Sequence, residues 1–351
     1  MSDDRRQRQV WPGRLIGIVI SAICIGLLAR QVDLVQAFHD LARLNGYVLL
    51  FPLTVFLVAI PLRALRWNAI FPLESRPGVP SCLTALGIGN MTNFLLPWRA
   101  GDVARCVLVG RGSSLADVSR TLATLGVEKA LDGLALVGMI LLTISSLSPP
   151  PWMVKLVWAG GILFGGALLI MVVLRYRAAS LIDVGIAALR RAHLAALGDR
   201  LQAPLASFAD GLAATSSGAQ MLRLLAMTAA IWTTEALIVL GLALSFGIEI
   251  SIRSAALVSA VLALGLMVPA GPGGLGTYEL AGVAGLKVVG VEPSSALALT
   301  LVIHAWAFIT NVGLGLCLLA LGVRPVKGVV RLEAARADWS PHTSPHARRE
   351  A

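Results

Sequence analysis

The stretch PAGPGGLGTYEL, residues 269–280, decides between two very different folds. Its glycines Gly271, Gly273 and Gly276 have the G-x-G-x-x-G spacing of a dinucleotide-binding fingerprint. That fingerprint needs a preceding strand and an acidic residue about twenty positions further on. Here the glycines follow an apolar run, and Thr277 stands where a phosphate-binding loop would place lysine. We interpret the stretch as a structural bend between two helices, made by Pro269, Gly273, Gly274 and Gly276. A tight surface loop between two ordinary helices is the alternative.

The composition of the whole chain is that of a membrane protein. Of 351 residues, 57% are hydrophobic and only 14% are charged. A helix needs about 20 apolar residues to cross the hydrocarbon layer, and strands would have to close a barrel. No alternating strand pattern occurs, so the fold class is an all-α, polytopic transmembrane bundle. Six full crossings are predicted from the apolar runs 15–29, 47–62, 121–147, 153–174, 224–248 and 296–323.

The basic residues predict the orientation of the chain. The net charge is +10, but Lys and Arg concentrate in alternate connections, so the excess is not a nucleic-acid signature. The connections rich in arginine fall within residues 5–14, 63–76, 99–120, 175–223 and 324–349. By the positive-inside rule these connections lie in the cytoplasm. The protein is therefore predicted to span a bacterial cytoplasmic (inner) membrane with both termini on the cytoplasmic side.

Two further segments, near 79–118 and 254–292, do not fit simple crossings. Each has an apolar half of about fifteen residues, a proline, a glycine-containing bend with a carboxylate, and a second short apolar half. Each half is too short to span the bilayer. We expect two re-entrant helical hairpins, related by an inverted repeat, because interrupted segments at matching places in two halves are typical of such repeats.

Charged residues surround the first bend, after Pro97. In LLPWRAGDVAR, a helix that starts near Gly101 puts Asp102 and Arg105 on one face, close to Arg99. Asp102 can pair with one arginine and leave the other for a phosphate group. Asn93 adds an uncharged donor. The alternative is an interfacial cluster that only anchors the hairpin.

The following helix contains VEKALDG, with the carboxylates Glu128 and Asp132 one turn apart. Two such carboxylates repel unless a cation lies between them, so Arg99, Arg105 or an amine of the substrate is expected there. Glu279 and His304 are the counterparts in the second half, although a lone helical histidine is more often a packing residue.

Other polar segments are assigned less specific roles. The segment RALRWN, residues 63–68, follows a crossing and is interpreted as a set of boundary anchors. Residues 178–213 are expected to form an amphipathic helix on the cytoplasmic leaflet, because leucines recur there at helical spacing. Glu235 is an isolated carboxylate, and 326–351 is predicted to be a disordered cytoplasmic tail.

These motifs resemble a known family. GNMTNFLLPWRAGDVARCVL is similar to the N-x-x-L-P-x-R-x-G-[ED]-x-x-R signature of the lysylphosphatidylglycerol synthase transmembrane, or flippase-like, family. VEKALDG and PAGPGGLGTYE resemble two further elements, and the likeness spans about residues 10–325, which we take as one transmembrane domain. The matching residues are Asn93, Pro97, Arg99, Gly101, Asp102, Arg105, Glu128, Asp132, Gly273, Gly274, Gly276 and Glu279. The departures from the family pattern are Asp102 in place of Glu, Lys129 in place of Arg, and His304 in place of a basic residue.

The resemblance implies a protein that translocates lipids whose head groups carry a phosphate or an aminoacyl group. The synthases of the family add a soluble transferase domain, which we do not find, and no catalytic, metal or cofactor motif is present. We therefore expect membrane lipids as partners and no enzyme activity, with assembly into a homo-oligomer left open. One alternative is an accessory protein for polyprenyl-linked glycolipids or hopanoid-like lipids. Another is an intramembrane transferase with Asp102 or Glu128 as base.

Overall fold

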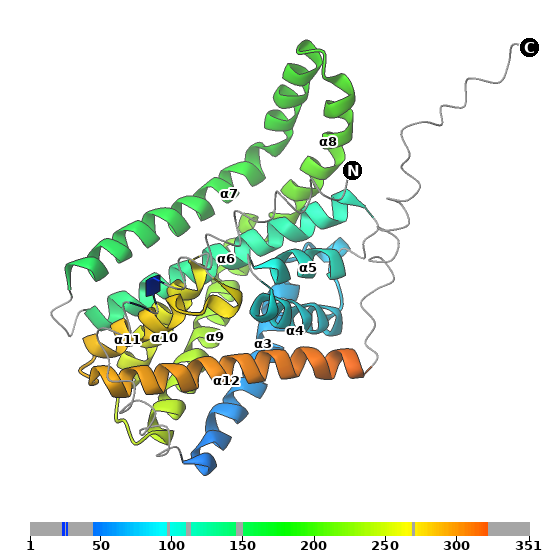
Figure 1. Cartoon of the computed structure of the whole chain (residues 1–351). Helices are drawn as coiled ribbons and strands as arrows, with labels where there is room; N and C mark the ends of the chain where they lie inside the picture. Colours follow the sequence, from blue (N-terminus) through cyan, green and yellow to red (C-terminus); the bar gives the residue numbers. More distant parts are fainter. Residues whose placement is uncertain are drawn as a thin grey trace, which may run out of the picture.

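The computed structural model describes residues 23, 24, 26, 45–96, 99–109, 114–144, 150–268 and 271–321, and this part of the chain is all-helical (Figure 1), as predicted. Four predicted features lie wholly or mostly outside these residues: the crossing at 15–29, the tail 326–351, Pro97 and Pro269. The α-helices are α3 (Leu50–Ile70), α4 (Val79–Leu95), α5 (Ala100–Val109), α6 (Leu115–Ile144), α7 (Pro151–Arg191), α8 (Ala195–Gly211), α9 (Gly218–Ser245), α10 (Ile252–Met267), α11 (Thr277–Val288) and α12 (Pro293–Ala320).

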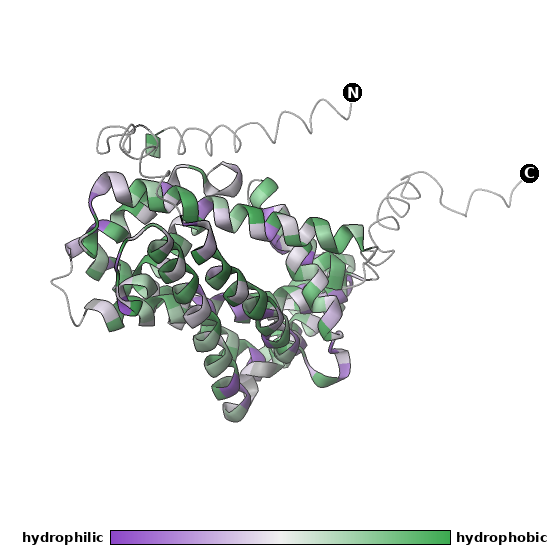
Figure 2. Ribbon diagram, turned by 90° about the horizontal axis from the view of Figure 1, so that it is seen from below, coloured by the Kyte–Doolittle hydropathy of each residue, from purple (hydrophilic) through white to green (hydrophobic). Residues whose placement is uncertain are grey.

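Long apolar helices form the body of the molecule. Among the described residues, four helical segments are long and apolar enough to cross a membrane: Gly46–Ile70, Pro151–Arg191, Gly218–Ser245 and Pro293–Ala320. The fifth long helix, α6, corresponds to the predicted run 121–147 but carries charged residues. The helices are mostly hydrophobic along their length (Figure 2), as expected for a bundle in lipid.

Residues 79–109 form a pair of closely packed helices, α4 and α5. The closest approach is at Gly89 and Gly101, where a Cβ on Gly101 would lie 1.8 Å from the Gly89 carbonyl oxygen. Only glycine allows two helix backbones to come this close. The Asn93 Oδ1 accepts a hydrogen bond from the Gly101 N–H at 2.8 Å and so bridges the break between the two helices.

Residues 252–288 form a second pair, α10 and α11, separated by the 3₁₀ turn Pro272–Gly274. Gly273, Gly274 and Gly276 all have positive φ, which explains why the bend is built from glycine. The Gly276 N–H donates to Glu279 Oε2 at 2.6 Å, so the Glu279 carboxylate caps the first turn of α11. The PAGPGGLGTYEL stretch is therefore a bend between helices, as we interpreted it.

The two pairs begin at opposite ends of α9. At the start of α9, Gln220 donates to the carbonyl of Ala69 near the end of α3, from which α4 follows. At its end, the Ser245 carbonyl accepts from the Asn45 N–H at 2.9 Å, and α10 follows. The breaks nevertheless meet, since a Cβ on Gly273 would lie 3.6 Å from the Phe94 carbonyl oxygen. This placement is what an inverted repeat would produce, although the position of the pairs in a bilayer stays a prediction.

Residues 178–213 are not one helix, so this part of the expectation is wrong, whereas their place on the cytoplasmic leaflet stays a prediction. Residues 178–191 continue α7 without a break, and α8 is a separate helix that returns beside α7 and α6, at the top of Figure 1. The break falls at His193, which has a φ of 60°. No proline interrupts the sequence from 152 to 191, so the apolar helix extends past its expected boundary. Leu212 is fully buried, whereas Leu194, Leu197, Leu201 and Leu205 are exposed.

Candidate functional site

A buried ion pair connects α5 to α6. The Arg105 guanidinium binds the Glu128 carboxylate through two hydrogen bonds of 3.1 and 2.8 Å, and the residues are 2% and 5% exposed. Arg105 was one of three cations expected beside Glu128 and Asp132, and it binds Glu128. Trp67 supports the arginine, with its ring centroid 4.2 Å from Arg105 Cζ and its indole N–H donating to Thr124. A bidentate geometry of this kind fixes both side chains in place.

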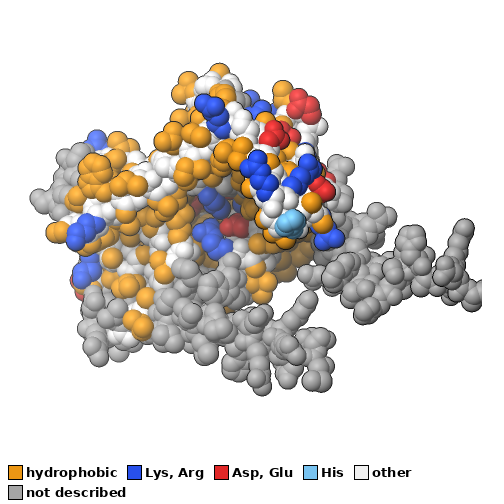
Figure 3. Space-filling model, turned by 90° about the horizontal axis from the view of Figure 1, so that it is seen from above, with side chains coloured by type: hydrophobic (Ala, Val, Ile, Leu, Met, Phe, Trp, Pro, Cys, Tyr) orange, Lys and Arg blue, Asp and Glu red, His pale blue; other side chains and the backbone are white. Residues whose placement is uncertain are grey.

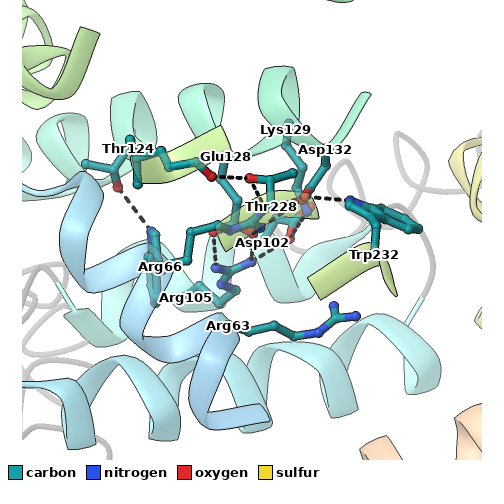
Figure 4. Close-up of polar contacts among 12 residues, drawn as sticks. Arg63, Arg66, Asp102, Arg105, Thr124, Glu128, Lys129, Asp132, Thr228 and Trp232 are labelled. Atoms are coloured by element: carbon teal, nitrogen blue, oxygen red, sulfur yellow. Dashed lines mark hydrogen bonds and ion pairs between the residues drawn. The ribbon is translucent and has the colours of Figure 1, made fainter. Parts of the chain in front are cut away.

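A second buried arginine, Arg66 of α3, lies between the two carboxylates of α6. Its terminal nitrogens are 2.5 and 3.1 Å from the oxygens of Asp132, and one is 3.9 Å from Glu128. Thr228 accepts a further hydrogen bond from Arg66, and Trp232 donates to Asp132 at 3.0 Å. Figure 4 shows these side chains converging from several helices. The expected cation between Glu128 and Asp132 therefore exists, and it is supplied by the protein itself.

The assignment of residues 63–68 as boundary anchors is wrong. Arg66 is 3% exposed and Trp67 is fully buried, and both belong to the charged cluster. Arg63 forms an ion pair with Glu235, so Glu235 is not isolated either. The sequence does contain a usable signal, because Arg63 and Arg66 are three residues apart and share a helix face. Their partners lie far away in the chain, so the pattern alone could not distinguish a buried face from an interfacial one.

The bend before α5 holds a looser group of charges. Asp102 lies 3.3 Å from Arg99 Nε, 3.6 Å from Lys129 Nζ and 3.8 Å from Arg105. Arg99 has a φ of 50°, an unusual value for a residue with a side chain and a form of backbone strain that often marks functional sites. Asp102 was expected to pair with one arginine and to leave the other for a phosphate group, and this expectation needs correction. Arg105 is held by Glu128, while Arg99 is the more accessible one, with 39% of its side chain exposed.

Glu279 and His304 form a separate buried pair in the second half. His304 Nδ1 lies 2.5 Å from Glu279 Oε1, and the His304 ring packs against Tyr278 at a centroid distance of 4.4 Å. Neither residue lines the cavity described below. The pair is nevertheless close to it, because Gly273, which does line the cavity, approaches His304 Nε2. The structure thus gives Glu279 an internal partner and a capping role.

A cavity of about 410 Å³ lies between the two helix pairs. Such a volume falls within the range of small-molecule sites. Its charged wall carries Arg63, Arg66, Arg99, Arg105, Glu128, Lys129, Asp132 and Glu235. A second wall has uncharged polar groups from α4 and α12, and α10 contributes an apolar wall. The space-filling view of Figure 3 shows a hollow in which basic and acidic side chains lie among hydrophobic ones.

The predicted site residues are thus distributed in two groups. The predicted residues that line the cavity are Arg99, Arg105, Glu128, Asp132 and Asn93. Asp102 does not line the cavity, but it contacts charged residues that do. The glycines of the second bend, Gly273 and Gly274, line the opposite end. The cavity residues that the sequence analysis missed are Arg63, Arg66, Lys129, Trp232 and Glu235.

Comparison with known proteins identifies the family. The family model described as "Lysylphosphatidylglycerol synthase TM region" matches residues 14–315. A curated relative, "Glycosyltransferase AglD" of Haloferax volcanii, is 23% identical over 319 residues, which cover 82% of this chain and 51% of the relative. The chain therefore spans about half the length of that relative. Because the family match extends over most of the chain, this protein belongs to the lysylphosphatidylglycerol synthase transmembrane family, as its motifs suggested.

Proposed function

We propose that this protein binds the phosphate-bearing head group of a membrane lipid in the cavity and moves it between the leaflets of the bilayer. One observation supports the proposal: a cavity within a membrane-type helical bundle is lined both by charged side chains and by apolar ones. Charged side chains at membrane depth are costly and usually face a cavity or a partner. A lipid suits such a lining, because its head group is ionic and the part of the molecule that joins the head group to the chains is apolar.

The helix breaks suggest how a lipid enters. Leu96 and Val268 flank the breaks, line the cavity and are themselves exposed. If both helix pairs are re-entrant, this opening faces the middle of the bilayer, so the acyl chains can stay in lipid while the head group enters. The two pairs then provide alternative gates, since they begin at opposite ends of α9. The proposed orientation has both termini in the cytoplasm of a bacterial cell, in agreement with the distribution of arginine.

The proposal is tested with purified full-length protein reconstituted into vesicles. Fluorescent phosphatidylglycerol crossing the bilayer is measured by the fraction that an impermeant quencher reaches. Arg99→Gln should slow the transfer about tenfold, the effect of losing ~1.4 kcal/mol of phosphate contact. Arg177→Gln, on an exposed position of α7 outside the cavity, is the matched control and should transfer like the wild type. Transfer no faster than in protein-free vesicles would refute the proposal.

A second candidate rests on the relative named as a glycosyltransferase. The same cavity would then hold a lipid-linked sugar phosphate, either as cargo or as the substrate of a transferase that uses Asp102 or Glu128 as base. Glu128 is held by Arg105 and Arg66, and Asp102 by Arg99 and Lys129, which disfavours proton transfer at either carboxylate. Mass spectrometry after incubation with a polyprenyl phosphate sugar separates the cases. New products would show an enzyme. A chemically unchanged lipid that has moved to the other leaflet would show transport.

A further inference from the structure

Among the described residues, the charged wall of the cavity, taken together with the adjoining Asp102, has one positive charge more than its carboxylates can match. Three arginines each have a carboxylate of their own: Arg63 with Glu235, Arg66 with Asp132, and Arg105 with Glu128. Arg99 and Lys129 remain, and among the described residues they share the single carboxylate of Asp102, at 3.3 and 3.6 Å. These two cations are also the accessible ones, with 39% and 32% of their side chains exposed.

Beside the cavity, three buried N–H donors of the described residues lack an acceptor. In the described part of the chain, four buried side-chain polar atoms have no hydrogen-bond partner: Arg66 Nε, Arg105 Nε, Trp306 Nε1 and Ser75 Oγ. The first three belong to residues that line the cavity, and all three are N–H donors. A buried donor without a partner is costly, so a ligand that brings oxygen acceptors suits these surroundings better than one that brings further donors.

We propose that the cavity selects a head group that carries a phosphate and no ammonium group, and therefore discriminates against aminoacylated lipids. This inference rests on the proposed function and specifies the cargo. A phosphate brings the missing negative charge to Arg99 and Lys129, and its oxygens are acceptors. The uncharged wall, with Asn90, Thr310 and Asn311, suits a remainder made of hydroxyl groups, such as glycerol or a sugar.

An ammonium group has no corresponding place in the cavity. All three carboxylates that line the cavity are paired with an arginine, and Asp132 also accepts from Trp232. An amine could take Glu128 or Asp132 only by separating a buried ion pair, which is strongly unfavourable. Glu235 is partly exposed, and an amine would have to compete there with Arg63. It would also add donors to a wall that already lacks acceptors. We therefore propose that the cations beside Glu128 and Asp132 are those of the protein, and not the substrate amine that the sequence analysis gave as one alternative.

The inference is tested by lipid competition on the full-length protein in detergent, with bound lipid quantified by mass spectrometry. Phosphatidylglycerol is offered against lysyl-phosphatidylglycerol, which has the same backbone and an added lysyl group, and against phosphatidylethanolamine. We expect phosphatidylglycerol to be enriched at least about tenfold over both, because like-charge contacts disfavour wrong partners strongly. A polyprenyl phosphate sugar, offered in a separate arm, tells whether a glycosyl remainder is preferred to glycerol.

Variants at Lys129 give the matched comparison. Lys129→Gln removes the unmatched charge and should reduce the enrichment to near unity, whereas Lys129→Arg should retain it. Lys155→Gln, an equivalent change on an exposed position of α7, should leave it unchanged. Equal or greater binding of lysyl-phosphatidylglycerol by the wild type would overturn this inference while the lipid-binding function stands. If the protein retains none of the lipids, both this inference and the proposed function are refuted.

Discussion

Arg105 and Glu128 join the second helix of one helix pair to the long helix that follows it, and they do so through two hydrogen bonds in a buried setting. Glu279 and His304 hold the same relationship in the other half, between α11 and α12. The carboxylate lies on the long helix in the first case and on the short helix in the second. Each half of the molecule thus fixes its helix pair to its neighbour by one buried polar contact.

Removal of either partner of the first contact should destabilise the protein strongly. Arg105→Ala leaves the Glu128 carboxylate buried beside Arg66 alone, and we expect a loss of about 3 to 5 kcal/mol in the free energy of unfolding, the usual cost of breaking a buried pair. Unfolding followed by circular dichroism in detergent measures it. The exposed pair Arg190–Asp199 is the control, and Asp199→Asn should cost at most ~1 kcal/mol. Similar small losses at both sites would contradict the buried pairing.

The glycine contact between α4 and α5 allows a second stability prediction. Gly101→Ala would place a methyl group 1.8 Å from the Gly89 carbonyl oxygen, so the pair must separate. A cost of about 3 kcal/mol or more is expected, at the upper part of the range for overpacking. Gly138→Ala on α6 meets no atom within 4 Å and should be neutral or slightly stabilising. The two variants are compared by melting temperature and by yield of folded protein. A well-folded Gly101→Ala protein would refute the close approach.

The sequence predicted this fold well wherever apolar length or glycine and proline spacing decides the outcome. The break at Gly273 to Gly276 follows from such local rules, because positive φ is required within the turn itself. The identity of the ion pairs does not follow, since Arg66 and Asp132 are 66 positions apart and meet only after α3 packs against α6. Helical periodicity could show that Glu128 and Asp132 need a cation between them. It could not show which of the several arginines of the chain pairs with them.

The role of Glu279 is predicted to be structural. In Glu279→Ala the Gly276 N–H loses its acceptor and His304 loses its partner, both in a buried setting. Each orphaned group costs roughly 1 to 3 kcal/mol, so the melting temperature should fall clearly. Glu279→Gln keeps an oxygen for Gly276 and should lose less. The ratio of bound phosphatidylglycerol to lysyl-phosphatidylglycerol should be the same in all folded variants. A changed ratio in a variant of normal stability would place Glu279 in contact with lipid.

The membrane position of the helix breaks can be tested by cysteine labelling. Leu96 and Leu275 lie at the two breaks, and both are about half exposed on the protein surface. If the pairs are re-entrant, these positions face lipid, so a cysteine there should react slowly with a membrane-impermeant maleimide in intact vesicles. Serine replaces the four native cysteines, and His193→Cys and Gly247→Cys, in the connections after α7 and α9, are the water-exposed controls. The predicted topology puts them on opposite sides of the membrane, so the one that faces out of the vesicle should react fast and the other only in detergent. Detergent gives the reagent access to both sides, so both controls should then react fast, and it should also accelerate Leu96→Cys and Leu275→Cys. Rapid labelling of these two positions in intact vesicles would instead place the breaks in water, and the cavity would then open to solvent rather than to the acyl chains.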